Sequence, residues 1–335
     1  MLSNNFGLEI GLDFIALSKI SKYNNDMYLT NIGYVNFAKN ITKYNERLSS
    51  KDVSQSLEKL IEDTKLKTRN CFLTVPSRLT TIGFCQIKSD PLVNIPLTIS
   101  KYFKDNLSPD KARYKLDWQQ LPIIYPNQDK SIKNYIVIGI KKSLLNLIDN
   151  FCKRSNLELV GVEPDIISVS RAIIGDNKLT ALIINFGKIS LELIMFVDGQ
   201  PIYFKQLDIG IDNWIKLITK ELKITNKQAI ELLRELDGQK IKELLKEDFI
   251  LIRKNIKNLL ELALKYTTIN SLNIVFAGEI LNYQQLLLKI VNNIDIVISK
   301  PAIPNFIVIN KGWENAIKDN YNKYIGSLGV SLNEY

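Results

Sequence analysis

Apolar and polar residues alternate with a strand period at the start of the chain. Large apolar side chains occupy every second position from Phe6 to Leu12, and glycine or acidic residues lie between them. Two further apolar runs follow, Ile15 to Ile20 and Met27 to Val35, and a polar turn at residues 24–26 separates them. The pattern predicts three antiparallel strands joined by short turns.

The second half of the chain repeats this pattern. Apolar runs at Ala181 to Phe186, Ser190 to Val197 and Pro201 to Leu207 predict three more strands. Asp198 and Gly199 between the last two runs form a typical two-residue hairpin turn.

Glycines at matching positions connect the two sets of strands. Gly11 and Gly33 lie 22 positions apart, and Gly187 and Gly210 lie 23 positions apart. The nearly equal spacing favours an internally duplicated fold. The spacing alone leaves two unrelated three-strand units as an alternative.

The remaining segments alternate between strands and amphipathic helices. The region from residue 77 to 159 is less regular and is predicted to be a small α/β insertion. Thr225 and Gln228 form a capping box that begins a helical block. Predicted strands are Cys71 to Val75, Thr80 to Ile87, Tyr135 to Ile140, Leu272 to Ala277 and Ile294 to Ile298; predicted helices include 53–61, Lys142 to Arg154, Asn226 to Leu236, Phe249 to Tyr266, Ile280 to Val291 and Trp313 to Leu332.

Composition narrows the function. The 335 residues are 46% hydrophobic and 24% charged, as in an ordinary soluble protein, and the longest apolar runs are too short for a membrane-spanning helix. The N-terminus lacks the features of a secretory signal, so we expect a cytoplasmic protein. The net charge of +9 comes from lysines spread among glutamates, which argues against a nucleic-acid surface.

Missing residue types exclude several chemistries. The chain contains no histidine, so catalysis by Ser–His or Cys–His pairs and zinc sites with histidine ligands are excluded. Cys71, Cys85 and Cys152 are too scattered for a disulfide framework or a Cys-x-x-Cys site. We therefore expect no metal site built from these side chains.

Short motifs follow one another in a characteristic order. They are Gly7-Leu8-Glu9-Ile10-Gly11; Val75-Pro76-Ser77; Ser155-Asn156-Leu157 through Pro164 to Ser170-Arg171-Ala172; Asp198-Gly199-Gln200-Pro201 through Asp208-Ile209-Gly210; Lys223-Ile224-Thr225 through Ala229; and Ser327-Leu328-Gly329-Val330.

In order and spacing these motifs resemble the PilM-type family of type IV pilus assembly proteins, within the actin and FtsA superfamily. The resemblance implies an α/β protein with a duplicated actin-like (ribonuclease H-like) two-lobed fold and an inserted 1C subdomain. It places subdomain 1A at 1–76 and 160–180, subdomain 1C at 77–159, subdomain 2A at 181–212 and 271–335, and helical subdomain 2B at 213–270.

The resemblance also implies a nucleotide site with a degenerate sequence. In ATP-binding members an aspartate helps to position hydrated magnesium, and small residues let backbone amides approach the phosphates. Here Glu9 replaces the aspartate, and Leu12, Asp13 and Phe14 replace the small residues. The positions that would form a weakened site for ATP with Mg²⁺ are Glu9, Gly11, Asn185, Gly187, Lys188 and Gly278.

One catalytic residue is implied by the same resemblance. Glu163 is the acidic residue placed best to orient an attacking water, and its alternative is a solvated side chain at a strand end. On the 2B helix, the nucleotide-facing positions counted from Ala229 hold Ile230 and Leu233, whereas a shift of one residue recruits Glu231 and Arg234.

The resemblance implies a cytoplasmic scaffold of pilus biogenesis and twitching motility. It would be recruited to the inner membrane by binding the N-terminal segment of a PilN-like partner near subdomains 1A and 1C, with self-association as a further possibility. Two alternatives stay open: an ATP-hydrolysing enzyme or small-molecule kinase on the same fold, and an FtsA-like division protein.

Overall fold

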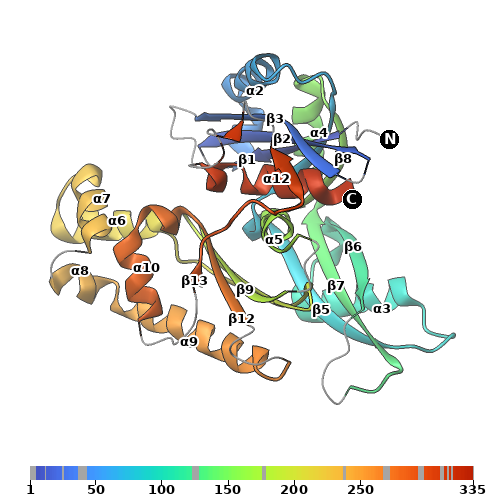
Figure 1. The fold of residues 1–335 in the computed structure, drawn as a ribbon. Helices are drawn as coiled ribbons and strands as arrows, with labels where there is room; N and C mark the ends of the chain where they lie inside the picture. Colours follow the sequence, from blue (N-terminus) through green and yellow to red (C-terminus); the bar gives the residue numbers. More distant parts are fainter. Residues whose placement is uncertain are drawn as a thin grey trace.

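Two α/β lobes and a smaller inserted sheet make up the protein in the computed structural model (Figure 1). The structure describes residues 5–11, 13–24, 26–36, 44–122, 128–175, 179–236, 239–266, 272–292, 298–309, 313–314, 317 and 320–334. The strand predicted at 294–298 lies mostly outside these residues.

The first lobe is built on a six-stranded sheet in the order β14-β3-β2-β1-β4-β8. Helices α1, α2 and α4 cover one face, and α5 and α12 cover the other, as Figure 1 shows for α2 and α12. The strands are β1 (Asn5–Ile10), β2 (Phe14–Tyr23), β3 (Asp26–Asn36), β4 (Asn70–Val75), β8 (Glu158–Pro164) and β14 (Ile307–Ile309); the helices are α1 (Tyr44–Ser49), α2 (Lys51–Asp63), α4 (Lys142–Arg154), α5 (Asp165–Ile174) and α12 (Ile325–Ser331).

The second lobe repeats this arrangement with a sheet in the order β11-β10-β9-β12-β13. Five helices pack on one face, and α5 of the first lobe and side chains of the inserted sheet pack on the other. The strands are β9 (Thr180–Phe186), β10 (Leu191–Val197), β11 (Gln200–Leu207), β12 (Leu272–Gly278) and β13 (Ile298–Ser299); the helices are α6 (Ile211–Leu222), α7 (Asn226–Glu235), α8 (Gln239–Leu244), α9 (Lys246–Ala263) and α10 (Gln284–Val291).

The two lobes also share the geometry of their first turn. The amide of Gly11 donates to the carbonyl of Phe14 at 2.9 Å, and the amide of Gly187 donates to the carbonyl of Ser190 at 2.9 Å. Each bond spans three residues and closes the turn between the first two strands of its lobe. Strand order and turn geometry together confirm the predicted duplication.

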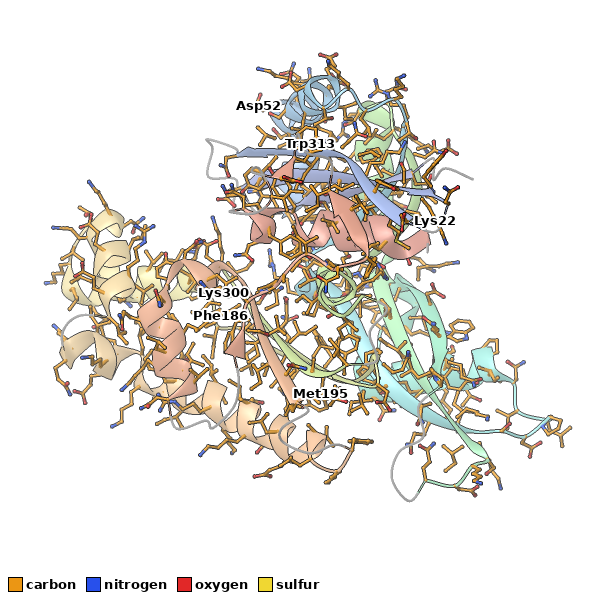
Figure 2. All side chains as sticks on the ribbon, viewed as in Figure 1. Lys22, Asp52, Phe186, Met195, Lys300 and Trp313 are labelled. Carbon is orange, nitrogen blue, oxygen red and sulfur yellow. The ribbon has the colours of Figure 1, made fainter. Side chains whose placement is uncertain are left out.

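Aromatic side chains hold the helices of the second lobe on its sheet. Phe186, labelled in Figure 2 at the end of β9, meets Trp214 of α6 edge to face at 5.0 Å between ring centroids. Trp214 in turn meets Phe249 of α9 at 5.5 Å, and its Nε1 donates to Asp248 at 2.6 Å. The indole thus buries its apolar body while its one polar atom stays hydrogen-bonded.

The insertion is a three-stranded sheet in the order β5-β7-β6, with α3 on one face. The sequence predicted β5 and β7 but not β6, where the apolar alternation of Tyr114, Leu116 and Trp118 is short. The helix α4, which lies within the region 77–159, packs its apolar side chains into the core of the first lobe. The elements are β5 (Thr80–Lys88), α3 (Ile95–Tyr102), β6 (Tyr114–Leu121) and β7 (Ile132–Lys141).

Helix α12 lies unusually close to its neighbours. A Cβ added at Gly329 would lie 1.7 Å from the carbonyl oxygen of Ser168 in α5, and one at Gly7 in β1 would lie 1.9 Å from the carbonyl oxygen of Ser327. Glycine is required at both contacts because the backbones meet there. Within the part of the chain that the structure describes, no helix has the length and apolar character to cross a membrane.

Candidate functional site

A cavity of about 560 Å³ lies between the two lobes at their glycine turns. All six residues that the sequence suggested for nucleotide binding line it, from three separate strands or turns. The lining combines carboxylates, three cations and several asparagines. The lining residues include Glu9, Gly11, Asp13, Phe14, Tyr34, Arg78, Asp165, Asn185, Gly187, Lys188, Ser190, Glu192, Gly278 and Lys323.

Glu163 lies outside this lining and is neither solvated nor free. Arg171 binds its carboxylate with two nitrogens, at 2.6 and 2.8 Å, and Ser168 donates to Oε1 at 2.7 Å. Arg171 also donates to the carbonyl of Gly329 at 2.9 Å. The side chain of Glu163 is therefore part of the contact between α5 and α12, and the reading of a solvated strand end was wrong.

The side chain of Glu9 is hydrogen-bonded to helix α12. The backbone amide of Ser327 donates to Glu9 Oε2 at 3.1 Å, and a Cβ at Gly326 would lie 2.3 Å from the same oxygen. The carboxylate thus occupies the first turn of α12, where unpaired amides favour an acceptor. Two short residues at Gly326 and Ser327 leave the room that this side chain needs.

Aromatic rings fill the first turn. A Cβ at Gly11 would lie 2.1 Å from the ring of Phe14, so the ring covers this glycine. Phe14 stacks on Tyr34 with ring centroids 5.3 Å apart, and the ammonium of Lys323 lies 5.3 Å from the Tyr34 centroid. The small hydroxyl residues expected in a phosphate-binding turn are replaced by a packed aromatic cluster. Leu12 lies outside the described residues.

An ion pair joins the two turns across the cavity. The ammonium of Lys188 in the second lobe donates to the carboxylate of Asp13 in the first. Burial alone would lower the pKa of Lys188, but the hydrogen bond and the charge of Asp13 raise it above its usual value. The cation of the second turn is therefore paired within the protein.

The second turn carries its own buried carboxylate. Asn185 donates to Glu192 Oε2 at 2.8 Å, and the hydroxyl of Ser190 bonds Oε1 at 3.1 Å. The sequence did not indicate Glu192 as a site residue, because it lies within the apolar run Ser190 to Val197, which predicts only a buried strand.

Asp165 is the third buried carboxylate of the cavity. It accepts the amide of Ser77 at 2.9 Å and the Ser77 hydroxyl, so it links the start of the insertion to the start of α5. Arg78 follows Ser77 and lines the cavity beside it. The Val75-Pro76-Ser77 motif marked the start of the insertion in the sequence. The sequence around it did not indicate that Ser77 bonds Asp165, 88 positions away.

Burial controls the ionisation of these groups. It raises the pKa of Glu9 to about 8, and the charge of Asp165 adds to this effect. It likewise raises the pKa of Glu192 to about 8, although bonds from Asn185 and Ser190 oppose the change. The pKa of Asp165 is raised by burial too, against the hydrogen bonds from Ser77. At neutral pH two of these carboxyls are largely protonated.

The strand end that would meet adenosine keeps its glycine. Gly278 has φ of +82°, and a Cβ there would lie 2.7 Å from the carbonyl oxygen of Phe186. On α7, Leu233 is fully buried, whereas the guanidinium of Arg234 lies over the ring of Tyr283 at 6.0 Å. Of the two predicted alternatives, Glu231 and Arg234 are the exposed pair. Among the described residues no cluster of acidic or cysteine side chains has the arrangement of a metal site.

Comparison with solved structures identifies the fold. One chain of a PilM–PilN type IV pilus biogenesis complex superposes with a TM-score of 0.79, covering 99% of this chain and 98% of that one at 12% identity. The chain has an actin-like fold. The ethanolamine utilization protein EutJ from Carboxydothermus hydrogenoformans is similar with a TM-score of 0.51, 11% identity and coverage of 98% and 88%. No family model and no curated protein matches the sequence.

Proposed function

We propose that this actin-like protein is a scaffold of a type IV pilus-like machine that works without hydrolysing nucleotide. It binds the cytoplasmic N-terminal segment of an inner-membrane partner of the PilN kind and is thereby recruited to the membrane. The observation that carries the proposal is the match over nearly the whole length of both chains to a protein solved within a PilM–PilN complex. At 12% identity this match shows a shared fold, and the function is argued from two further observations.

The first support comes from the cavity, whose residues do not fit a magnesium nucleotide. At the two glycine turns a triphosphate needs free backbone amides, a free cation and room. Here the amides of Gly11 and Gly187 bond to their own turns, Lys188 is paired with Asp13, and the ring of Phe14 fills the first turn. The buried Glu9 and Glu192 would oppose phosphate once ionised.

The second support comes from the inserted sheet, where a groove suits an extended segment. A cavity of about 400 Å³ lies between β5 and α3 and is lined by Phe84, Cys85, Gln86, Ile87, Thr98 and Tyr102. Among the described strands β5 pairs with β7 alone, and the carbonyl of Phe84 in β5 accepts the hydroxyl of Tyr102 at 2.9 Å. A partner strand would therefore pair along the rest of the other edge of β5. We place the partner segment along this edge.

Isothermal titration calorimetry tests the proposal. The full chain is titrated with Mg-ATP and, separately, with a synthetic peptide of the partner's cytoplasmic N-terminus. We expect peptide binding with no measurable nucleotide affinity. Tight binding of Mg-ATP would overturn the nucleotide-independent part, and lack of peptide binding would overturn the scaffold role.

A pair of variants tests the place of docking. Thr98→Trp fills the groove between β5 and α3 and should weaken peptide binding at least about tenfold, or about 1.4 kcal/mol. Ser56→Trp is the matched control, because Ser56 on α2 also bonds a carbonyl four residues earlier, as Thr98 does. Equal affinities for the two variants would place the peptide elsewhere.

The alternative function is ATP hydrolysis. It is favoured by the gathering of six expected nucleotide residues around one cavity of about 560 Å³ between the lobes. The same calorimetry decides between the two, because an ATPase must bind Mg-ATP.

A further inference from the structure

The inserted sheet has a second free edge, along β6. In the described part of the chain β6 pairs with β7 alone, and Figure 1 shows it on the outer side of this sheet. Along β6, residues 115 and 117–120 are exposed, among them Trp118 with 37% of its surface accessible. A free strand edge presents unpaired amides and carbonyls, which proteins usually protect.

One hydrogen bond shows which backbone groups face this edge. The amide of Trp118 donates to Oδ1 of Asp117 at 2.9 Å instead of entering the ladder with β7. In an antiparallel ladder, residues two apart direct their backbone groups to the same side. The amides and carbonyls of Tyr114, Leu116 and Trp118 therefore face the free edge together.

The sequence of β6 is complementary to itself when it runs antiparallel. Reading outward from Leu116, Lys115 and Asp117 lie at equal distances on either side, and so do Tyr114 and Trp118. A two-fold axis through Leu116 would place each lysine opposite an aspartate and each tyrosine opposite a tryptophan. Opposite charges and paired aromatics facing each other across strands are stabilising.

We propose that β6 is a self-association edge, at which two copies of this chain pair their β6 strands antiparallel about Leu116. The backbone groups of Tyr114, Leu116 and Trp118 form the hydrogen-bonded pairs of this β6–β6 interface. Lys115 and Asp117 then fall in the non-hydrogen-bonded pairs, where side chains approach most closely, with Cα atoms about 4.5 Å apart.

The β6–β6 interface also explains why the amide of Trp118 bonds the side chain of Asp117 in the free chain. In the free chain the carboxylate of Asp117 holds this outward amide; in the pair the amide bonds Tyr114 of the second copy. Asp117 is then released to meet Lys115 of the second copy. Because a strand edge buries less surface than a standard protein interface, the association should be weak and concentration-dependent.

Sedimentation velocity over a concentration series of the full chain tests the proposal. Lys115→Asp and Asp117→Lys each put like charges opposite one another and should weaken the dimer at least about tenfold. The double variant K115D/D117K restores opposite charges in every pair and should recover most of the association. Lys153→Asp is the control, because it reverses an exposed lysine paired with Asp149 on α4, away from β6.

Circular dichroism and thermal unfolding show that each variant is folded, which is expected because positions 115 and 117 are exposed. A wild-type chain that stays monomeric at every concentration would overturn the proposal. So would a dimer that ignores both single reversals, or one that the double variant fails to restore. None of these outcomes bears on binding of the partner segment, which lies along β5 at the opposite edge.

Discussion

Lys188 and Asp13, 175 positions apart in the sequence, form an ion pair that joins the two lobes of this actin-like protein. Each residue lies in the glycine turn of its own lobe, so the pair spans the cavity between them. Both side chains keep some exposure to solvent, so the pair should add little to stability. Its main consequence is that it removes the one cation of the second turn from any anionic ligand.

Releasing this cation should create some nucleotide affinity. In Asp13→Ser the ammonium of Lys188 is free and the repulsion of phosphate by a carboxylate is gone, so measurable Mg-ATP binding should appear where the wild type shows none. Calorimetry measures the change. The double variant D13S/K188A is the control and should lose the gain; equal affinity of D13S and the wild type would show that the ion pair does not limit binding.

The contact between Glu9 and α12 should be sensitive to one methyl group. In Gly326→Ala the new Cβ would lie 2.3 Å from Glu9 Oε2, so the Glu9 side chain must shift and give up its bond to the Ser327 amide, which should lower the free energy of unfolding by about 1 kcal/mol. Gly187→Ala is the control, since its Cβ meets only the Ser190 carbonyl oxygen, at 3.3 Å. Urea unfolding measures both, and the loss should shrink in G326A/E9A because the clashing carboxylate is absent.

Stability should fall as pH rises through neutrality. Glu9 and Glu192 have pKa values of about 8 in the folded protein against a usual 4.5, so the folded state holds protons that the unfolded chain releases. Their contribution is complete below about pH 4.5 and is lost as pH approaches 8, at most about 1.4 kcal/mol per pH unit for each group.

Urea unfolding between pH 5 and 8 measures this loss. Glu9→Gln should make the fall in the free energy of unfolding between pH 5 and 8 shallower, because one of the two titrating carboxyls is gone. Glu247→Gln, at an exposed position, should leave the pH dependence unchanged. A profile for Glu9→Gln as steep as that of the wild type would contradict the protonated state of Glu9.

The pair of Glu163 and Arg171 should matter for stability. Arg171→Ala leaves the carboxylate of Glu163, only 11% exposed, without its bidentate partner, and should cost about 3 kcal/mol. The double variant E163Q/R171A should recover much of this, because no unpaired buried charge remains. Chemical unfolding measures both; a mild effect of Arg171→Ala would show that water replaces the guanidinium.

The local sequence determined most strands and their duplication. Apolar alternation from Phe6 onward and from Ala181 onward predicted the first strands of both lobes, because a strand with one buried face repeats every two residues. The strand β6 was not predicted, although Tyr114, Leu116 and Trp118 alternate there with polar residues, because the alternation covers only five positions before two glutamines. The position of α4 also escaped, since an amphipathic helix does not encode which core it joins.

The residues that line the cavity between the lobes show which properties the sequence does not predict. The sequence by itself determined the six residues that a resemblance could align, including Gly11, Lys188 and Gly278. Only the tertiary structure decided that Glu9 bonds Ser327, 318 positions away, and that Lys188 meets Asp13. Periodicity and turn signals report on neighbours within a few residues, whereas ionisation and ion pairing depend on burial and on partners that packing brings from distant parts of the chain.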